Sequence, residues 1–398
     1  MTTTFHITLR PILILSKSIG LIDITYTVEP SGLLAHNKNS AFHAVLEITR
    51  MIVLLICTFL YFHQFDPEVH ILQIINTIKF WIIIIAARLS TKRIIKFING
   101  IIEFDRKIKP LATNLLTTKR SWSKKQWNMI FISIFVYFIG FKFFFIYMRF
   151  LKIHNIVSLL HYALFSIPYV MDYVVTITSC FFLQNTFVRF QTLNDVWNCL
   201  PAGLAIVPGH WTHDQIVDVM ENTRLLHSEL CELLKAFTLG YGPMLLGFFS
   251  SSFINMLLCV YFIVINNEGS TSSHPTEGFW EKILPLMVHV QIVTFLLSVI
   301  VFVSFINDKR LKIISYLRLY QISNLHLDIK RQIKMFMNQI SACDSDQISA
   351  FGFFYINLNL VTSILVLLIS GIITLIQMKN HPVILKFNND TINFLGKL

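Results

Sequence analysis

Charged side chains are scarce in this sequence, at 14% of 398 residues, whereas a soluble domain carries about 25%. Residues 347–378 contain no Asp, Glu, Lys or Arg. As one helix they would extend over roughly 48 Å at about 1.5 Å per residue, which exceeds the ~30 Å hydrocarbon core of a bilayer. The shortage of charge excludes an ordinary soluble domain and predicts an integral membrane protein.

Signatures of enzymes and metal sites are also missing. The chain contains no GxGxxG, P-loop, HExxH or GxSxG motif, so we do not expect an enzyme. The six cysteines have no CxxC spacing, which argues against a disulfide framework and a zinc site. His210 and His213 lie three residues apart without further ligands nearby in the sequence. We therefore expect no metal and no other cofactor.

Apolar blocks fill most of the chain and predict a single all-α polytopic unit without separate soluble domains. Seven blocks can be placed as membrane spans, at residues 44–64, 71–90, 129–148, 158–183, 239–265, 283–306 and 350–378. The net charge of +11 could indicate nucleic acid. Because the basic residues lie between the apolar blocks, we interpret them as topology signals and expect no nucleic-acid partner.

The distribution of Lys and Arg orients the spans. If the N-terminus is cytoplasmic, the inner segments hold 24 of these residues and the outer segments hold 6. This bias is the one expected of a membrane protein whose cytoplasmic loops are basic. The chain then divides into a cytoplasmic segment 1–43, six spans with inner loops in 44–306, a cytoplasmic anchor segment 307–349, a last helix 350–378 and an extracellular tail 379–398. The sequon at Asn389 would be an external glycosylation site.

The inner segments have helical patterns of their own. In 212–237, apolar residues recur at steps of three and four, which predicts an amphipathic extension of the fifth span that packs on a neighbour. The stretch 311–340 is expected to continue the sixth span as a helix. Glu47 and Arg50 lie one turn apart near the start of the first span and could pair.

The final block is unusually polar for a helix that faces lipid. Its polar residues are Tyr355, Asn357, Asn359, Thr362, Ser363, Ser370, Thr374 and Gln377. Such groups prefer a protein interface or water to lipid, so this helix is a candidate wall of an aqueous path. Interhelical hydrogen bonds, and for Gln377 an interfacial position at a helix end, remain alternatives.

Other spans carry candidates for a small-molecule pocket, since such pockets combine aromatic walls with a few polar groups. The candidates are Tyr137, Phe141, His161, Tyr162, Phe165, Tyr169, His289 and Gln291. Aromatic residues at helical spacing also occur as ordinary packing, which stays open here. Lys142 lies within the third span, where a charge must be paired, face a cavity or extend to the outer end of the helix. We favour the extended arrangement.

The C-terminal block resembles the signature region of insect gustatory receptors. That signature is a Thr-Tyr pair, five apolar residues and Gln-Phe; here Ser370-Gly371 is followed by IITLI and by Gln377-Met378. Gly352-Phe353-Phe354 and the INLNLVTSIL that follows it are similar to the lead-in of that family's last helix. Gly371 and Met378 depart from the pattern. Insect odorant receptors share the architecture.

The resemblance implies a homotetrameric or heterotetrameric ligand-gated cation channel. The last helices of four subunits would surround one pore, with Gln377, Thr374 and Ser370 lining it and Met378 at the outer gate. A small-molecule tastant would bind in the outer half of each helix bundle, and the inner helical extensions would form a cytoplasmic anchor. Membrane lipid and permeant cations are the other expected partners, and the multi-pass chain would lie in the cell membrane of a sensory neuron.

Two other functions remain open at this point, an odorant-receptor-type channel subunit and a non-channel seven-helix receptor. A G-protein-coupled receptor is disfavoured, because a cytoplasmic N-terminus reverses its topology and its motifs are missing. A transporter is disfavoured because the chain has no internal repeat.

Overall fold

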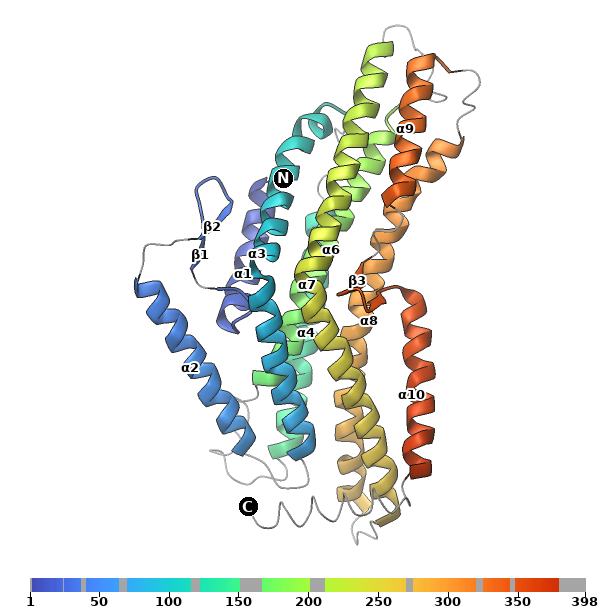
Figure 1. Ribbon diagram of the computed structural model, residues 1–398. Helices are drawn as coiled ribbons and strands as arrows, with labels where there is room; N and C mark the ends of the chain where they lie inside the picture. Colours follow the sequence, from blue (N-terminus) through green and yellow to red (C-terminus); the bar gives the residue numbers. More distant parts are fainter. Residues whose placement is uncertain are drawn as a thin grey trace.

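The computed structural model describes residues 2–23, 25–36, 41–63, 70–115, 122–150, 167–200, 212–269, 275–319, 325–343 and 348–378. The described chain is almost entirely helical (Figure 1). Its elements are α1 (Thr2–Ser18), β1 (Tyr26–Val28), β2 (Leu34–His36), α2 (Ala41–His63), α3 (His70–Leu115), α4 (Trp122–Phe150), α6 (Ile167–Trp197), α7 (His213–Gly269), α8 (Pro275–Leu319), α9 (Leu327–Cys343), β3 (Ser349–Ala350), β4 (Phe354–Tyr355) and α10 (Leu358–Met378). The strands form two antiparallel pairs, β1 with β2 and β3 with β4.

Each of the seven expected spans falls on a separate helix. In chain order these helices are α2, α3, α4, α6, α7, α8 and α10. Stretches long and apolar enough to cross a bilayer occur in α2, α3, α7 and α8, and shorter apolar stretches occur in α4 and α10. The fourth expected span begins outside the described residues, since α6 is described from Ile167. The prediction of an all-α membrane protein is confirmed.

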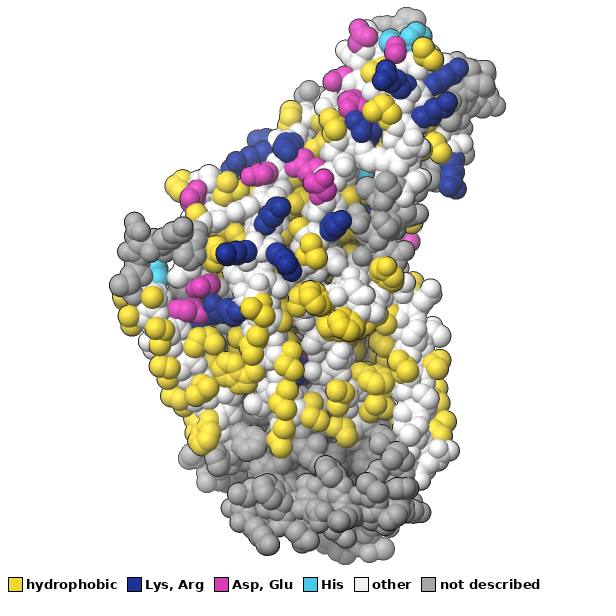
Figure 2. All heavy atoms as spheres, viewed as in Figure 1, with side chains coloured by type: hydrophobic (Ala, Val, Ile, Leu, Met, Phe, Trp, Pro, Cys, Tyr) yellow, Lys and Arg dark blue, Asp and Glu magenta, His cyan; other side chains and the backbone are white. Residues whose placement is uncertain are grey.

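Three helices extend far beyond a bilayer. α3 has 46 residues, α7 has 57 and α8 has 45, so they run for roughly 70, 85 and 70 Å, more than twice a hydrocarbon core of about 30 Å. Figure 2 shows apolar side chains over the lower part of the coloured surface and charged side chains over the upper part. The long helices therefore join a membrane region to a polar region without interruption.

The second span was expected to end near residue 90, but α3 continues to Leu115. Lys92, Arg93 and Lys96 made this region look like a loop, yet all three are exposed on one side of the helix. A different sector of the helix surface carries Phe97, Ile101, Phe104 and Ile108, which are fully buried at steps of four and three. The segment is thus an amphipathic helix whose apolar stripe is covered by its neighbours.

A second hydrophobic core lies in the polar region. It joins the end of α6, the start of α7, the end of α8 and all of α9, and its buried residues include Trp197, Met220, Leu317, Ile333 and Phe336. The expected amphipathic extension at 212–237 is confirmed as the first part of α7. The expectation that 311–340 is helical is confirmed for the described part of the stretch. Only the part up to Leu319 continues the sixth span as α8, and residues 327–340 belong to a separate helix, α9.

Polar contacts fix α9 against α7 in this core. The Arg224 guanidinium donates to Gln339 Oε1 at 3.0 Å, and the Gln339 amide donates to the Arg224 carbonyl at 3.0 Å. Arg224 also bonds both carboxylate oxygens of Glu221 at 2.6 and 3.0 Å, which lowers the pKa of that carboxyl. These contacts give the docking of α9 a specific register on α7.

The N-terminal segment is folded onto the bundle. α1 buries Leu9, Ile12 and Leu13 in the main core, and the Arg88 guanidinium donates to the Gly20 carbonyl at 3.1 Å. Arg88 and Arg50 both pair with Glu47, so the expected contact between Glu47 and Arg50 is confirmed. Sharing one carboxylate between two helices ties α2 to α3 at the boundary of the apolar region.

The last helix begins at Leu358, whereas it was expected from residue 350. The residues before it form the β3–β4 hairpin, which turns at Phe351 and Gly352 with φ of 53° and 80°. A helix cannot pass through two successive residues with positive φ. Asn357 instead caps α10, since its Oδ1 accepts the Leu360 amide at 3.1 Å. The 21 residues of α10 then extend over roughly 31 Å, about the thickness of a hydrocarbon core.

The hairpin packs against α7 at Gly242. A Cβ atom there would lie 2.9 Å from the Phe351 amide nitrogen and 3.3 Å from the Ser349 carbonyl oxygen. Both neighbours are backbone atoms, which cannot move aside without distorting the turn. Gly242 is therefore a close approach of two backbones, a situation that requires the absence of a side chain.

We predict that Gly242→Ala destabilises the protein by about 1–3 kcal/mol, the usual cost of forcing an extra methyl group into a packed site. Gly140→Ala is the matched control, because no described atom outside its own stretch of helix backbone lies within 4 Å of a Cβ at that glycine. The control should be neutral or stabilising, since Gly in a helix costs about 0.5–1 kcal/mol relative to Ala. Thermal unfolding in detergent, monitored by size-exclusion chromatography, measures the stability of both variants. Equal melting temperatures for the two variants would contradict the close approach.

Candidate functional site

A polar stripe runs along α10. Its members are Asn359, Ser363, Ser370, Thr374 and Gln377, all exposed. With about 100° of rotation per residue, a helix of 3.6 residues per turn places these five positions within a sector of roughly 60°. The stripe therefore extends from the first turn of α10 to the last turn.

The opposite side of α10 packs on the rest of the chain, mainly on α7 and α8. Val361, Ile364 and Leu368 are partly buried against the main core. At Gly371 a Cβ would lie 2.8 Å from Leu257 Cδ2 on α7, so this departure from the gustatory-receptor pattern allows two helices to approach closely. The polar stripe thus faces away from its own helix bundle, and α10 stands at the edge of the molecule (Figure 1).

Two adjacent leucines show where the packed side of α10 ends. Leu367 lies on the exposed side. Its exposed fraction is 55%, because it lies next to the polar stripe on the helix circumference. Leu368, one residue later, is the position that packs on the core.

The hydroxyl groups and the amide of the stripe differ in their hydrogen bonds. The Ser370 hydroxyl donates to the Leu367 carbonyl at 3.1 Å, and the Thr374 hydroxyl donates to the Ser370 carbonyl at 2.8 Å. Such bonds within the helix allow a hydroxyl to face lipid. Gln377 has an amide that the described residues leave exposed, and an amide in hydrocarbon without a partner is costly. The structure places Met378 at the end of α10, with its side chain outside the described residues.

A buried ion pair lies between α3 and α6, within the apolar region. Lys79 Nζ is 2.7 Å from Asp172 Oδ2, and the side chains are 1% and 7% exposed. Lys79 is nine residues from the start of α3 and Asp172 is five residues from the start of α6. The pair therefore lies toward the end of the bundle opposite to α9. Neutralisation by a partner is what permits charged groups at such a depth.

Further polar groups gather on the same helices. One turn from Lys79, Asn76 accepts a 2.9 Å hydrogen bond from the Asn255 amide on α7. Among the buried atoms of the described residues that have no hydrogen-bond partner there are Asp172 Oδ1, the Tyr173 hydroxyl, Ser252 Oγ and Asn255 Oδ1. Buried polar atoms without protein partners are expected to bind water or a ligand.

Aromatic rings adjoin the ion pair. The Tyr173 ring stacks on Phe138 of α4 with centroids 4.3 Å apart, and Lys142 Nζ lies 6.0 Å from the centroid of the same Phe138 ring. Lys142 also interacts electrostatically with Asp172. Its ammonium group is thus directed into the bundle, so the expectation that it extends to the outer end of α4 is wrong. The attraction of a carboxylate and an aromatic face explains this direction.

The candidate pocket residues have different outcomes. Tyr137 contacts Phe141 and Phe295, with ring centroids 6.4 Å apart in both pairs, and Gln291 is buried. His161, Tyr162 and Phe165 lie outside the described residues, as does Asn389. Tyr169 and His289 lie on α6 and α8, with their side chains outside the described part. The described candidates, on α4 and α8, therefore lie toward the same end of the bundle as the ion pair between α3 and α6. Their assignment to a ligand pocket stays a prediction.

Asp172 was missed by the sequence reasoning. It interrupts the apolar run around residues 170–175 in the fourth expected span, and Lys79 similarly interrupts the second. Two opposite charges within different spans are a signal for an intramembrane pair, because neither is tolerated alone in hydrocarbon. Their separation of 93 residues gives no information about which spans are neighbours.

We predict that Lys79→Met and Asp172→Asn each destabilise the protein by about 3–5 kcal/mol, because each leaves one buried charge without its partner. The double variant should lose clearly less than the sum of the two single losses. The midpoint of thermal unfolding in detergent provides the comparison. Additive losses in this double-mutant cycle would mean that the two groups do not stabilise one another.

The family model described as 7tm Chemosensory receptor matches residues 9–380. No curated protein matches the chain. The family match covers all the described helices from the middle of α1 to the end of α10, in agreement with seven helices that correspond to the expected spans. The chain belongs to the 7tm chemosensory receptor family.

Proposed function

We propose that this chemosensory receptor is a subunit of a ligand-gated cation channel that a small-molecule tastant opens. The observation that carries the proposal is the polar stripe of α10, which faces away from the chain's own bundle. Uncharged polar side chains toward both ends of a spanning helix, aligned on one side, are suited to water, and an aqueous path needs such a surface. In this proposal Ser370, Thr374 and Gln377 line the pore and Met378 lies at its gate.

A pore requires more than one copy of α10. A single helix at the edge of a bundle cannot enclose a path, whereas repetition around a cyclic axis can. We propose four copies, as either a homotetramer or a heterotetramer with related chains. The polar region with its second hydrophobic core, which contains α9 and the first half of α7, would supply the cytoplasmic anchor.

The ligand is proposed to bind around the ion pair of Lys79 and Asp172. Aromatic rings of α4 and α8 would supply apolar walls, and the buried polar atoms without protein partners would supply hydrogen bonds. These are the two components of a typical small-molecule site. Tyr137, Phe141 and Gln291 are the described residues that we assign to it, together with His161, Tyr162, Phe165, Tyr169 and His289 from the sequence.

The proposed orientation has the N-terminus and α9 in the cytoplasm, in a multi-pass protein of the cell membrane of a sensory neuron. Its basis is the division of Lys and Arg, 24 inside against 6 outside. The charged upper part of the surface in Figure 2 is then the cytoplasmic part. Cations and membrane lipid are the remaining partners.

We predict that a peptide tag at residue 398 is labelled by antibody on intact cells, whereas a tag before residue 10 is labelled only after permeabilisation. An odd number of spans places the two termini on opposite sides, and the basic segments choose the side. Flow cytometry measures the labelling. The reverse result would overturn the orientation and would favour a non-channel receptor that acts through a G protein.

We predict that Gln377→Glu shifts permeability toward divalent cations, because a ring of carboxylates would surround the pore axis. Met378→Ala should increase current without ligand, since a wider and less apolar ring is easier to wet. Leu368→Ala is the control on the packed side of α10. It should lower expression and leave selectivity unchanged. The decrease in the free energy of unfolding should be at most about 2–5 kcal/mol, the usual cost for a packed leucine.

Patch-clamp recording from cells that express only this chain, with surface protein quantified in parallel, measures these effects. Normal surface expression with unaltered leak and selectivity in both variants at the end of α10 would refute the pore assignment. Ligand responses without any current of the receptor's own would support the non-channel alternative. An odorant-receptor-type subunit would conduct current as the proposed tastant-gated channel does, but it would respond to different ligands.

A further inference from the structure

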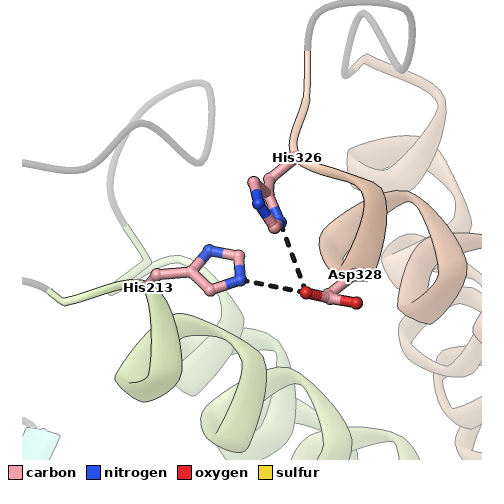
Figure 3. A group of neighbouring side chains, drawn as sticks. All are labelled: His213, His326 and Asp328. Atoms are coloured by element: carbon pink, nitrogen blue, oxygen red, sulfur yellow. Dashed lines mark hydrogen bonds and ion pairs between the residues drawn. The ribbon is translucent and has the colours of Figure 1, made fainter.

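Two histidines and an aspartate meet at the far end of the polar region. His213 is the first residue of α7, His326 directly precedes α9 and Asp328 lies in the first turn of α9 (Figure 3). His213 Nε2 is 3.5 Å from Asp328 Oδ2, and His326 Nδ1 is 3.3 Å from the same oxygen. One ligand atom from each of the three residues lies within 4.8 Å of the other two.

We propose that His213, His326 and Asp328 form a binding site for a divalent transition-metal ion, with Zn²⁺ as the expected occupant. Zinc takes tetrahedral ligands at distances of about 2.0–2.2 Å, which separates the ligand atoms from one another by about 3.3–3.6 Å. The distances of 3.3 and 3.5 Å to Asp328 Oδ2 fall in this range. Small rotations of the imidazole rings would therefore suffice to complete the site.

The donor types select the class of metal. Two imidazole nitrogens with one carboxylate suit zinc and neighbouring transition metals, whereas Ca²⁺ and Mg²⁺ prefer oxygen ligands. The site is accessible, with side-chain exposures of 23% for His213, 61% for His326 and 60% for Asp328. Water would complete the coordination on the exposed side, as in sites with three protein ligands.

The charges around the site have opposite effects on a bound cation. The starts of α7 and α9 carry partial positive charge from their unpaired backbone amides. Acidic residues occupy the first turn of both helices, Asp214 in α7 and Asp328 in α9, and they offset that charge. A metal bound here would join the two helix starts, at the end of the same interface that Arg224 and Gln339 hold together.

Sequence spacing could not reveal this site. The expectation that His213 has no further ligands rested on the residues next to it, including His210, which lies outside the described residues. The carboxylate that completes the cluster is 115 residues away in the chain. Only the docking of α9 on α7 brings the three side chains together.

Zinc binding by the full-length chain in detergent tests the proposal, after removal of metal with EDTA and titration against a chromophoric chelator. We expect one saturable site per chain. His326→Ala and Asp328→Asn should each weaken binding by more than about a hundredfold, since changes at outer-shell partners already cost 10–100-fold. His43→Ala, on α2, is the matched control and should bind as the unaltered chain does.

The chain has 14 histidines, so weak binding elsewhere must be separated from this site. Co²⁺ in place of Zn²⁺ gives an intense visible absorption when its coordination is tetrahedral, and both ligand variants should abolish that absorption. Asp328→Asn is nearly isosteric at an exposed position, which protects the test from misfolding. Unchanged zinc affinity in both variants would overturn the proposal and leave an ordinary hydrogen-bonded cluster. The outcome does not depend on channel activity, since no current is measured.

Discussion

The close contact between α3 and α7 is the constraint on which the rest of the structure depends. Glycines permit it at three levels, where Gly100 meets Leu233, Gly240 meets the backbone of Ile94, and Gly247 meets Ile82. Small residues at helix interfaces let backbones approach closely, and the van der Waals packing that results contributes to helix association in lipid. Because α7 continues from the apolar region into the polar region, it takes part in both hydrophobic cores.

Sequence patterns predicted this architecture where one side of a helix differs clearly from the other. The amphipathic steps in 212–237 indicated the polar-region half of α7, and each charge-poor block corresponds to a separate helix of the structure. The same reasoning ended α3 too early, because an average over Lys92, Arg93 and Lys96 hides the buried stripe of Phe97 and Ile101. Hydropathy averaged around a helix measures composition, whereas packing depends on which side each residue occupies.

The candidate sites were predictable only in part, for a different physical reason. The polar residues of α10 lie close together in the chain, so Ser370, Thr374 and Gln377 could be recognised from the sequence as polar positions in a charge-free helix. The ion pair of Lys79 with Asp172 joins residues far apart in the chain, and the turn at Phe351 depends on a backbone conformation that a charge-free run of sequence conceals. Tertiary pairing and positive φ angles leave little trace in composition.

Pro243 lies inside α7 and makes this helix locally easier to bend. Proline has no amide hydrogen, so the Leu239 carbonyl loses its usual partner and the helix is locally easier to bend. Gly242, the adjacent residue, is where the hairpin preceding α10 touches α7. The position at which α7 bends most easily is thus next to the position at which the hairpin before α10 contacts it. A small change in the angle of α7 at this point would therefore displace the hairpin and, with it, the start of α10.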